Sequence, residues 1–485
     1  LGDVYKRQEI RNSGETFSSG FLFIKLKIKG DKMENKMPKD FFWGNSTSSM
    51  QTEGGWNEGG KGPSVYDVNT VGRSAKDWQV TNDNYHHYSQ DLDLMKEMNM
   101  NMYRFQISWS RIVPDGDGEF NEEGIAFYNR LIDDLLARGI EPMICLYHFD
   151  MPLNLAEKYN GFLSRKVKEA FVRFGQEMMK RFADKVKYWI VFNEHNLYFA
   201  DGFEHYSGVL KKELTLSDMY TVFHHTMLAH CELTQFLHEN FEAKIGGMLA
   251  TTEIYPATFS PKDNLYLRKF DEFYNRNLCD VYAFGHYSHE VMTYVKNQNI
   301  QMDFQKGDEE ILKNGISDFI SFSYYRSILL DASQLTENDA PNSYLTKGMK
   351  LNPLLEHNQW DWSIDPEGFR RILSRLYNEF GLPVFPIENG IGQSEIWDGK
   401  TKIADDLRIS YHQKHLEAMK KAIFTDGVEV MGYLGWGLID IPASSGAIDK
   451  RYGAVYVDSK SHKRIPKKSF HWFKNVFASN GDHLD

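Results

Sequence analysis

Two glutamates follow short apolar runs, at positions where a charge needs an explanation. Glu194 closes the run YWIVFNE, and Glu388 closes the run PVFPIE. Two carboxyl groups on different strands that face one cavity are the minimal apparatus for cleaving a glycosidic bond. The alternative is that each carboxylate ends a strand as the structural partner of an arginine or lysine. Two such glutamates, each beside an asparagine (Asn193 and Asn389), favour the chemical interpretation.

The elements that would position these groups alternate between strands and helices. Residues 122–138 place apolar side chains at spacings of three and four, with Asn121 as N-cap and Gly139 as a stop. Asp365 followed by Pro366 predicts the start of another helix. Apolar runs of strand length separate such segments, and we predict eight strands: 41–46, 101–109, 142–149, 188–194, 244–252, 318–325, 383–388 and 429–438.

Strands that alternate with helices imply parallel pairing through right-handed crossovers. Eight such units close a barrel, so we predict an α/β fold, a single (β/α)8 TIM barrel with extended βα loops. In that fold catalytic groups gather at the carboxyl edge of the strands, where Glu194 and Glu388 stand. The segments 254–317 and 331–362 are expected to be insertions that wall the mouth of the site.

Composition excludes several classes of partner. The 485 residues carry a net charge of −11, which argues against nucleic acid or an anionic membrane as the main partner. Cys145, Cys231 and Cys279 are scattered, without metal spacing, and are typical of reduced cytosolic thiols. The segment 21–29 is too short for a membrane span and lacks a signal-peptide cleavage site. We therefore expect a cytoplasmic protein.

The first residues differ from the rest of the chain. Met33 and Met37 are candidate starts, because the first convincing strand follows directly. We expect residues 1–36 to be a disordered or non-native extension and residues 37–480 to form the barrel domain. Oligomeric state is left open.

Further polar groups lie on other predicted strands or shortly after them, and together they favour a polar pocket at the same barrel edge. They are Gln51, Arg104, His148, Tyr325 and Trp436.

Seven segments, in this order, resemble glycoside hydrolase family 1. They are FFWGNSTSSMQTEGGWNEGGKGPSVYD (41–67), YRFQISWSRIVP (103–114), LYHFDMP (146–152), FNEHNL (192–197), DFISFSYY (318–325), IENG (387–390) and GWGLID followed by KRYGAVYVD (435–458).

The resemblance implies a role for each matching residue. Glu194 would be the general acid/base and Glu388 the nucleophile of a retaining glycosidase, with Arg104 and Tyr325 orienting the nucleophile. Sugar hydroxyls would be bound by Gln51, His148 and Asn193, and Trp436 would lie beneath the ring. The chemistry implies no metal and no organic cofactor.

Two positions depart from the family pattern without removing a catalytic group. His195 stands where the family usually has Pro or Ile, and Pro386-Ile387 precede the nucleophile where Ile-Thr or Ile-Val is common.

The segment after the last strand predicts the substrate class. Family members that act on plain glycosides carry Glu-Trp here, which this chain lacks. Ser444, Lys450 and Tyr452 resemble the phosphate-binding residues of the 6-phospho-β-glucosidase branch, and Ser445 is the alternative serine. A cation with two hydroxyl donors suits a phosphate. The alternative for Lys450 is an ordinary surface lysine.

The resemblance therefore implies retaining hydrolysis of 6-phospho-β-glucosides, such as phosphorylated cellobiose or aryl β-glucosides. Phe149 after His148 and the absence of Trp beside Ala443 favour glucosides over galactosides. Three alternatives stay open: a 6-phospho-β-galactosidase, a plain β-glucosidase and, more remotely, an inactive sugar-phosphate-binding protein.

Overall fold

The structure is a computed structural model that describes residues 36–68, 75–211, 213–444, 446 and 449–485. Met37–Asp485 form one compact unit. The prediction for the N-terminal extension falls, apart from Lys36, outside the described residues and stays a prediction.

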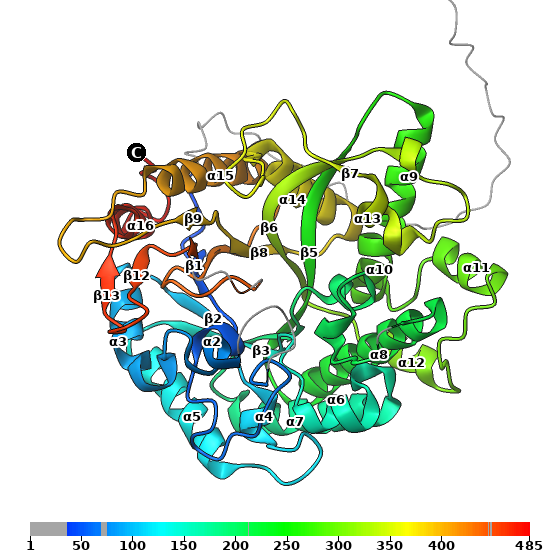
Figure 1. The fold of residues 1–485 in the computed structure, drawn as a ribbon, viewed down its shortest axis with the longest axis horizontal. Coiled ribbons are helices and arrows are strands. Elements are labelled where there is room, and N and C mark those ends of the chain that lie inside the picture. Colours follow the sequence, from blue (N-terminus) through cyan, green and yellow to red (C-terminus); the bar gives the residue numbers. More distant parts are fainter. Residues whose placement is uncertain (1–35, 69–74, 212, 445, 447–448) are drawn as a thin grey trace, which may run out of the picture. The chain divides into compact units, whose positions relative to one another are not determined.

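Eight parallel strands form the barrel at the centre of this unit (Figure 1). Pairing runs from β10 through β1, β2, β3, β4, β5 and β6 to β8. A parallel bridge between Val384 and Val430 closes the ring. The predicted barrel and its eight strands are confirmed: β1 (Phe42–Ser46), β2 (Met102–Gln106), β3 (Glu141–Tyr147), β4 (Tyr188–Phe192), β5 (Lys244–Pro256), β6 (Phe319–Leu330), β8 (Val384–Asn389) and β10 (Gly432–Trp436).

Helices surround the strands as an outer ring (Figure 1). Two predicted caps are confirmed, because Asn121 accepts a hydrogen bond from the backbone N–H of Glu123, and Asp365 accepts one from Gly368. The larger helices are α3 (Asn84–Glu97), α5 (Glu122–Ala137), α7 (Arg165–Phe182), α8 (Leu216–Asn240), α9 (Pro261–Asp271), α10 (Asn277–Phe284), α11 (His289–Asn297), α14 (Pro366–Phe380), α15 (Asp406–Phe424) and α16 (Lys468–Ala478).

Short elements connect the barrel strands and the larger helices. They are α1 (Ser49–Thr52), α2 (Ala75–Val80), α4 (Trp109–Ile112), α6 (Leu153–Tyr159), α12 (Asp308–Asn314), α13 (Tyr344–Gly348), β7 (Met349–Lys350), β9 (Gln393–Ser394), β11 (Lys450–Arg451), β12 (Val455–Val457) and β13 (Arg464–Pro466), with 3₁₀ turns such as η2 (His195–Phe199) and a π-helix, η4 (Glu272–Arg276). Of the helices that the structure describes, none has the length and apolar character needed to cross a membrane.

Strands β5 and β6 are longer than predicted, and the insertions are more regular. The two strands pair beyond the barrel as far as Pro256 and Leu330, where Ile254 and Ile328 form a small core with Phe270. The sequence of the two strands alone does not predict this apolar contact with α9. The segment 254–317 is only partly a wall, because α10 and α12 pack on the barrel exterior against β5 and α8.

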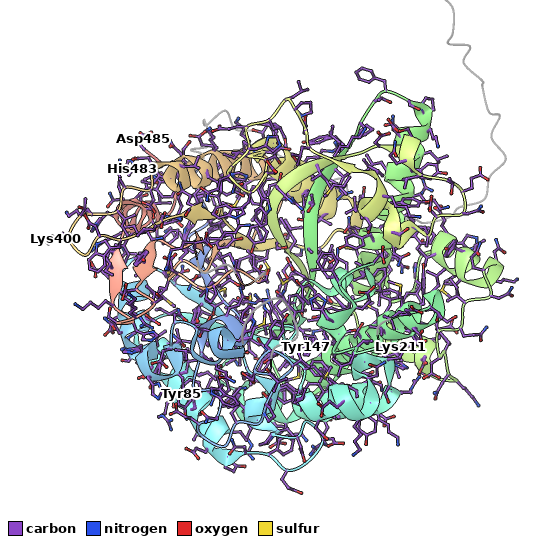
Figure 2. All side chains as sticks on the ribbon, in the orientation of Figure 1. Tyr85, Tyr147, Lys211, Lys400, His483 and Asp485 are labelled. Atoms are coloured by element: carbon purple, nitrogen blue, oxygen red, sulfur yellow. The ribbon has the colours of Figure 1, made fainter. Side chains whose placement is uncertain are left out.

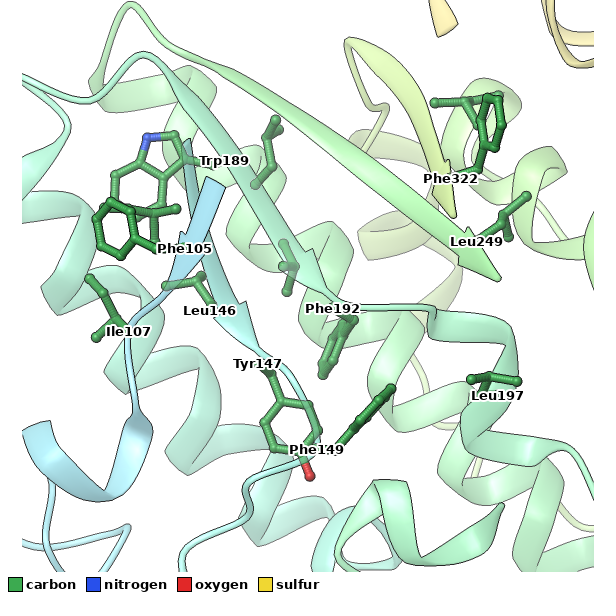
Figure 3. Packing of buried hydrophobic residues seen from close by; sticks show 14 of the residues in the cluster. Phe105, Ile107, Leu146, Tyr147, Phe149, Trp189, Phe192, Leu197, Leu249 and Phe322 are labelled. Carbon is green, nitrogen blue, oxygen red and sulfur yellow. The ribbon is translucent and has the colours of Figure 1, made fainter. Parts of the chain in front are cut away.

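Two layers of buried side chains hold the barrel. The larger lies between strands and helices, where Phe105, Leu146 and Trp189 come from three successive strands (Figure 3). The smaller fills the barrel interior and includes Met102 and Leu434. In the view with all side chains, buried Tyr147 lies in the interior and exposed Lys400 at the edge (Figure 2).

Candidate active site

The ends of two barrel strands carry the predicted carboxyl pair. Glu194 follows β4 and adopts a left-handed conformation, with φ of 43°, which is uncommon for a residue with a side chain and often marks a functional site. Glu388 lies within β8 and is only 3% exposed. The two carboxyl groups are close enough for the charge of Glu388 to raise the pKa of Glu194.

Arg104 and Tyr325 hold the carboxyl group of Glu388. Alternation along β2 places Arg104 on the same barrel-facing side as Met102. Its Nη1 lies 2.8 Å from Oε1 of Glu388, and the Tyr325 hydroxyl donates a 2.8 Å hydrogen bond to Oε2. An arginine ion pair and a hydroxyl donor both favour the ionised form of this carboxyl group.

Arg104 also orients Asn193. Its Nη2 donates a 2.7 Å hydrogen bond to Oδ1 of Asn193, which leaves the buried Nδ2 of that amide without a partner among the described residues. Buried donors of this kind are costly unless something binds them. Asn193 therefore presents a free donor beside both carboxyl groups.

His148 and Trp436 form an aromatic wall. The imidazole stacks on the indole with ring centroids 5.6 Å apart. Burial, with Arg104 nearby, keeps the pKa of His148 well below its usual range, so the ring is neutral. Its Nδ1 is buried and has no hydrogen-bond partner in the described part of the chain. A neutral ring nitrogen and an indole face are suited to a hydroxylated ring.

Gln51 joins this site to the segment after β10. Its side-chain amide donates a 2.8 Å hydrogen bond to the carbonyl of Pro442, and its oxygen accepts one from the Ser48 hydroxyl. The glutamine is fully buried. The predicted sugar-binding residue therefore lies against the segment predicted to bind phosphate.

The electrostatics separate the roles of the two carboxyl groups. Burial and the neighbouring charge of Glu388 raise the pKa of Glu194 to about 8, so this group is protonated at neutral pH. Burial also raises the pKa of Glu388, but Arg104 and Tyr325 oppose that shift. One protonated and one anionic carboxyl group in one cavity can supply an acid and a nucleophile.

The segment after β10 brings Lys450 and Tyr452 to the same place. Lys450 is only 6% exposed, so the alternative of a surface lysine is wrong. Tyr452 packs edge-on against Tyr325, with ring centroids 6.2 Å apart. Ser444 is exposed and lies close enough to Tyr206 to lower the pKa of that phenol, which burial raises. The alternative serine, Ser445, lies outside the described residues.

A cavity of about 270 Å³ opens beyond this site. Its lining comes from the extended ends of β5 and β6, from η4 and from α13, and includes Ile254, Tyr274, Arg326 and Leu345. Among the residues that the structure describes, no group of three or more His, Cys, Asp or Glu side chains is arranged to hold a metal ion.

Comparison with known proteins adds to this geometry. The family model described as glycosyl hydrolase family 1 matches residues 33–482. The chain belongs to this family. It is 39% identical over 483 residues to the aryl-phospho-β-D-glucosidase BglA of Bacillus subtilis, covering 92% of this chain and 99% of that protein. It is 36% identical to the 6-phospho-β-glucosidase AscB of Escherichia coli, again covering 92% and 99% of the two chains.

Solved structures support the same family and fold. A family 1 β-glucosidase from Thermotoga maritima superposes with a TM-score of 0.82 at 28% identity, covering 93% of this chain and 99% of that chain. This family 1 member is therefore a glycosidase with the TIM-barrel fold.

Reasoning from the sequence assigned no role to several residues of this family 1 site. Ser323 donates a 2.5 Å hydrogen bond to Oε1 of Glu194, and Ser46 accepts a 3.1 Å hydrogen bond from Arg104. Trp362 lies beneath Lys450. Ser323 and Ser46 stand inside the segments 318–325 and 41–67 that carried the resemblance. Trp362 ends the predicted insertion 331–362, where no local pattern marked it.

Proposed function

We propose that this chain hydrolyses 6-phospho-β-D-glucosides with retention of configuration and releases glucose 6-phosphate. The observation that carries the proposal is Lys450, a cation that is 94% removed from solvent and that has no carboxylate partner among the described residues. A buried unpaired charge is costly, and an anionic group of the substrate would offset that cost. The names of the Bacillus subtilis and Escherichia coli relatives support the same substrate class.

In the proposed reaction Glu388 attacks the anomeric carbon while Glu194 donates its proton to the glycosidic oxygen. The aglycone leaves as an alcohol, and the sugar is held as an ester of Glu388. Glu194, now ionised, takes a proton from water as that water attacks the anomeric carbon and releases Glu388. Two inversions at one carbon give net retention. The contacts of Arg104 and Tyr325 suit them to keep Glu388 anionic and aligned.

Other side chains are assigned to the substrate. The free donor of Asn193 and the unpaired nitrogen of His148 are suited to sugar hydroxyls, with Gln51 beside them and Trp436 as the platform. Lys450, Tyr452 and Ser444 are assigned to the 6-phosphate. We also infer a cytoplasmic location, because the three cysteines are unpaired and buried and a phosphorylated glycoside is an intracellular substrate class.

The test is a comparison of kcat/KM on three p-nitrophenyl substrates: β-D-glucoside 6-phosphate, β-D-glucoside and β-D-galactoside 6-phosphate. We expect a preference of at least about 100-fold for the first over the unphosphorylated glucoside, as about 3 kcal/mol of charge-assisted binding would give. A preference for either of the others would overturn the substrate class. No turnover of any of the three would favour an inactive binding protein.

A further inference from the structure

Arg326 is a second cation on the indole ring that supports Lys450. It follows Tyr325 on β6, beyond the end of the barrel. The Cζ atom of Arg326 lies 5.4 Å from the centroid of Trp362, and Nζ of Lys450 lies 3.5 Å from the same centroid. Arg326 was not among the site residues predicted from the sequence, and it lines the 270 Å³ cavity beside the site.

Within the described part of the chain, neither cation is neutralised by an acidic group. No carboxylate of the described residues forms an ion pair with Arg326 or Lys450, whereas the buried Arg104 and Arg111 pair with Glu388 and Glu53. Lys450 is buried and Arg326 is partly buried, and two like charges near each other in such surroundings destabilise each other.

The pKa values of both cations reflect their burial. Burial lowers the pKa of Lys450 to about 8, with a further contribution from the charge of Arg326. Burial also lowers the pKa of Arg326. An anion bound by both cations would offset the cost of burying them, so this pair is suited to an occupant of negative charge.

We propose that Arg326 is a specificity-determining residue that binds the same substrate oxyanion as Lys450, namely the phosphate monoester of the glycoside. This inference rests on the proposed function and adds to it a residue beyond Ser444, Lys450 and Tyr452. A phosphate dianion presents three oxygens, which is enough to accept from an ammonium group, a guanidinium fork and a hydroxyl together. A guanidinium group also interacts favourably with an aromatic face, and Cζ of Arg326 lies over the ring of Trp362.

Arg326 also borders the cavity, so an acidic group on the aglycone is the other source of a negative charge for Arg326 to bind. The experiment separates the two sources. The kcat/KM of wild type, Arg326→Met and Arg326→Lys is measured on p-nitrophenyl β-D-glucoside 6-phosphate, on p-nitrophenyl β-D-glucoside and on 4-carboxyphenyl β-D-glucoside. Arg181→Met, on the outer helix α7, is the matched control for loss of an arginine.

For Arg326→Met we expect the ratio of kcat/KM for the phosphorylated to the plain nitrophenyl glucoside to fall about 10-fold or more, as for loss of a charge-assisted contact. Arg326→Lys should recover part of that ratio, and Arg181→Met should leave it as in wild type. A fall confined to the carboxyphenyl substrate would overturn the proposal in favour of the aglycone. Equal falls on all three substrates would overturn it in favour of a structural role.

The pH dependence of the same ratio gives a readout that a structural role would not move. Glu194 acts on both nitrophenyl substrates, so its titration cancels, and the ratio reports the phosphate-binding cations. In wild type the ratio should fall above a pH of about 8, where Lys450 loses its proton. Without the charge of Arg326 the pKa of Lys450 rises, so in Arg326→Met the fall should move to higher pH.

If the ratio of kcat/KM values falls at the same pH in Arg326→Met as in wild type, the inference is contradicted.

Failure of the proposed function and failure of this inference give different results. A wild-type enzyme with no preference for the phosphorylated substrate overturns both the proposed function and this inference. A wild-type preference that Arg326→Met retains in full overturns the inference alone.

Discussion

The hydroxyl of Ser323 donates a 2.5 Å hydrogen bond to the carboxyl group of Glu194. The same serine is paired with Glu388 in the register between β6 and β8, so it stands between the two carboxyl groups of the site. The bond favours the ionised form of Glu194 and so lowers a pKa that burial and Glu388 raise. Ser323 thereby sets how far the acid is shifted from an ordinary glutamate.

Removal of this hydroxyl should make Glu194 a weaker acid. In Ser323→Ala the pKa of Glu194 should rise above its value of about 8, because the one hydrogen bond to its carboxyl group from the described residues is lost. The alkaline limb of the kcat/KM profile should then move to higher pH, while the acidic limb, which reports Glu388, stays in place.

The matched control is Ser321→Ala. Ser321 is buried two residues earlier on the same strand, and its hydroxyl donates to the carbonyl of Gly247 instead. Its profile should keep the wild-type alkaline limb. A limb that fails to move in Ser323→Ala would show that Glu194 is not the group that titrates there.

Replacement of the proposed nucleophile should be rescued by a small anion. Glu388→Ala should lose about 10⁴-fold or more in kcat, because no covalent intermediate forms. The cavity it leaves should admit azide, which attacks the anomeric carbon once. NMR of the glycosyl azide should therefore show the α configuration. A glycosyl azide of β configuration would mean that Glu388 is not the nucleophile. Rescue of Glu194→Ala without rescue of Glu388→Ala would mean that the two glutamates have exchanged roles.

Lys450 should matter for the phosphate and little for the rest of the substrate. A charge-assisted contact contributes about 1.5–3 kcal/mol, so Lys450→Ala should lower the ratio of kcat/KM for phosphorylated to plain glucoside by about 10- to 100-fold. Lys421→Ala, with its side chain 55% exposed on α15, is the control. Equal losses on both substrates would mean that Lys450 does not contact phosphate.

The barrel could be predicted because its eight strands are buried apolar runs that local sequence displays directly. The order of the polar strand ends then brought Arg104, Asn193 and Glu388 to one edge. Ser323 could not be predicted, since a serine has no pattern of its own and its role depends on the register between β6 and β8. The separation of the two carboxyl groups, about 5–5.5 Å in a retaining enzyme, stays a prediction.

The two departures from the family pattern have structural explanations that a sequence does not reveal. Pro386 lacks a backbone N–H, and it is accommodated because the register between β6 and β8 shifts directly after its pairing with Phe322. His195 is fully buried, and its ring nitrogens bond to the hydroxyls of Tyr282 and Thr226. It therefore anchors the turn that carries Glu194.

A buried carboxyl group outside the catalytic pair should make stability depend on pH. Asp150 accepts hydrogen bonds from Gln106, Ser49 and Ser108, yet burial raises its pKa to about 7. In the unfolded chain its pKa is about 3.9. Between these values the folded state keeps a proton that the unfolded state releases, so the contribution of Asp150 to stability falls as pH rises, by about 1.4 kcal/mol per unit, and levels off above pH 7.

Asp150→Asn should remove this contribution, because an amide matches the protonated acid in shape and does not titrate. Urea unfolding of wild type and variant at pH 5 and pH 7 measures the difference. Glu194 and Glu253 also have raised pKa values, so several groups share the wild-type slope of stability against pH, and the change in that slope on substitution isolates Asp150. Asp117→Asn, at an exposed position, controls for loss of a charge. An Asp150→Asn protein whose stability falls between pH 5 and 7 as steeply as wild type would show that Asp150 is already ionised at pH 5.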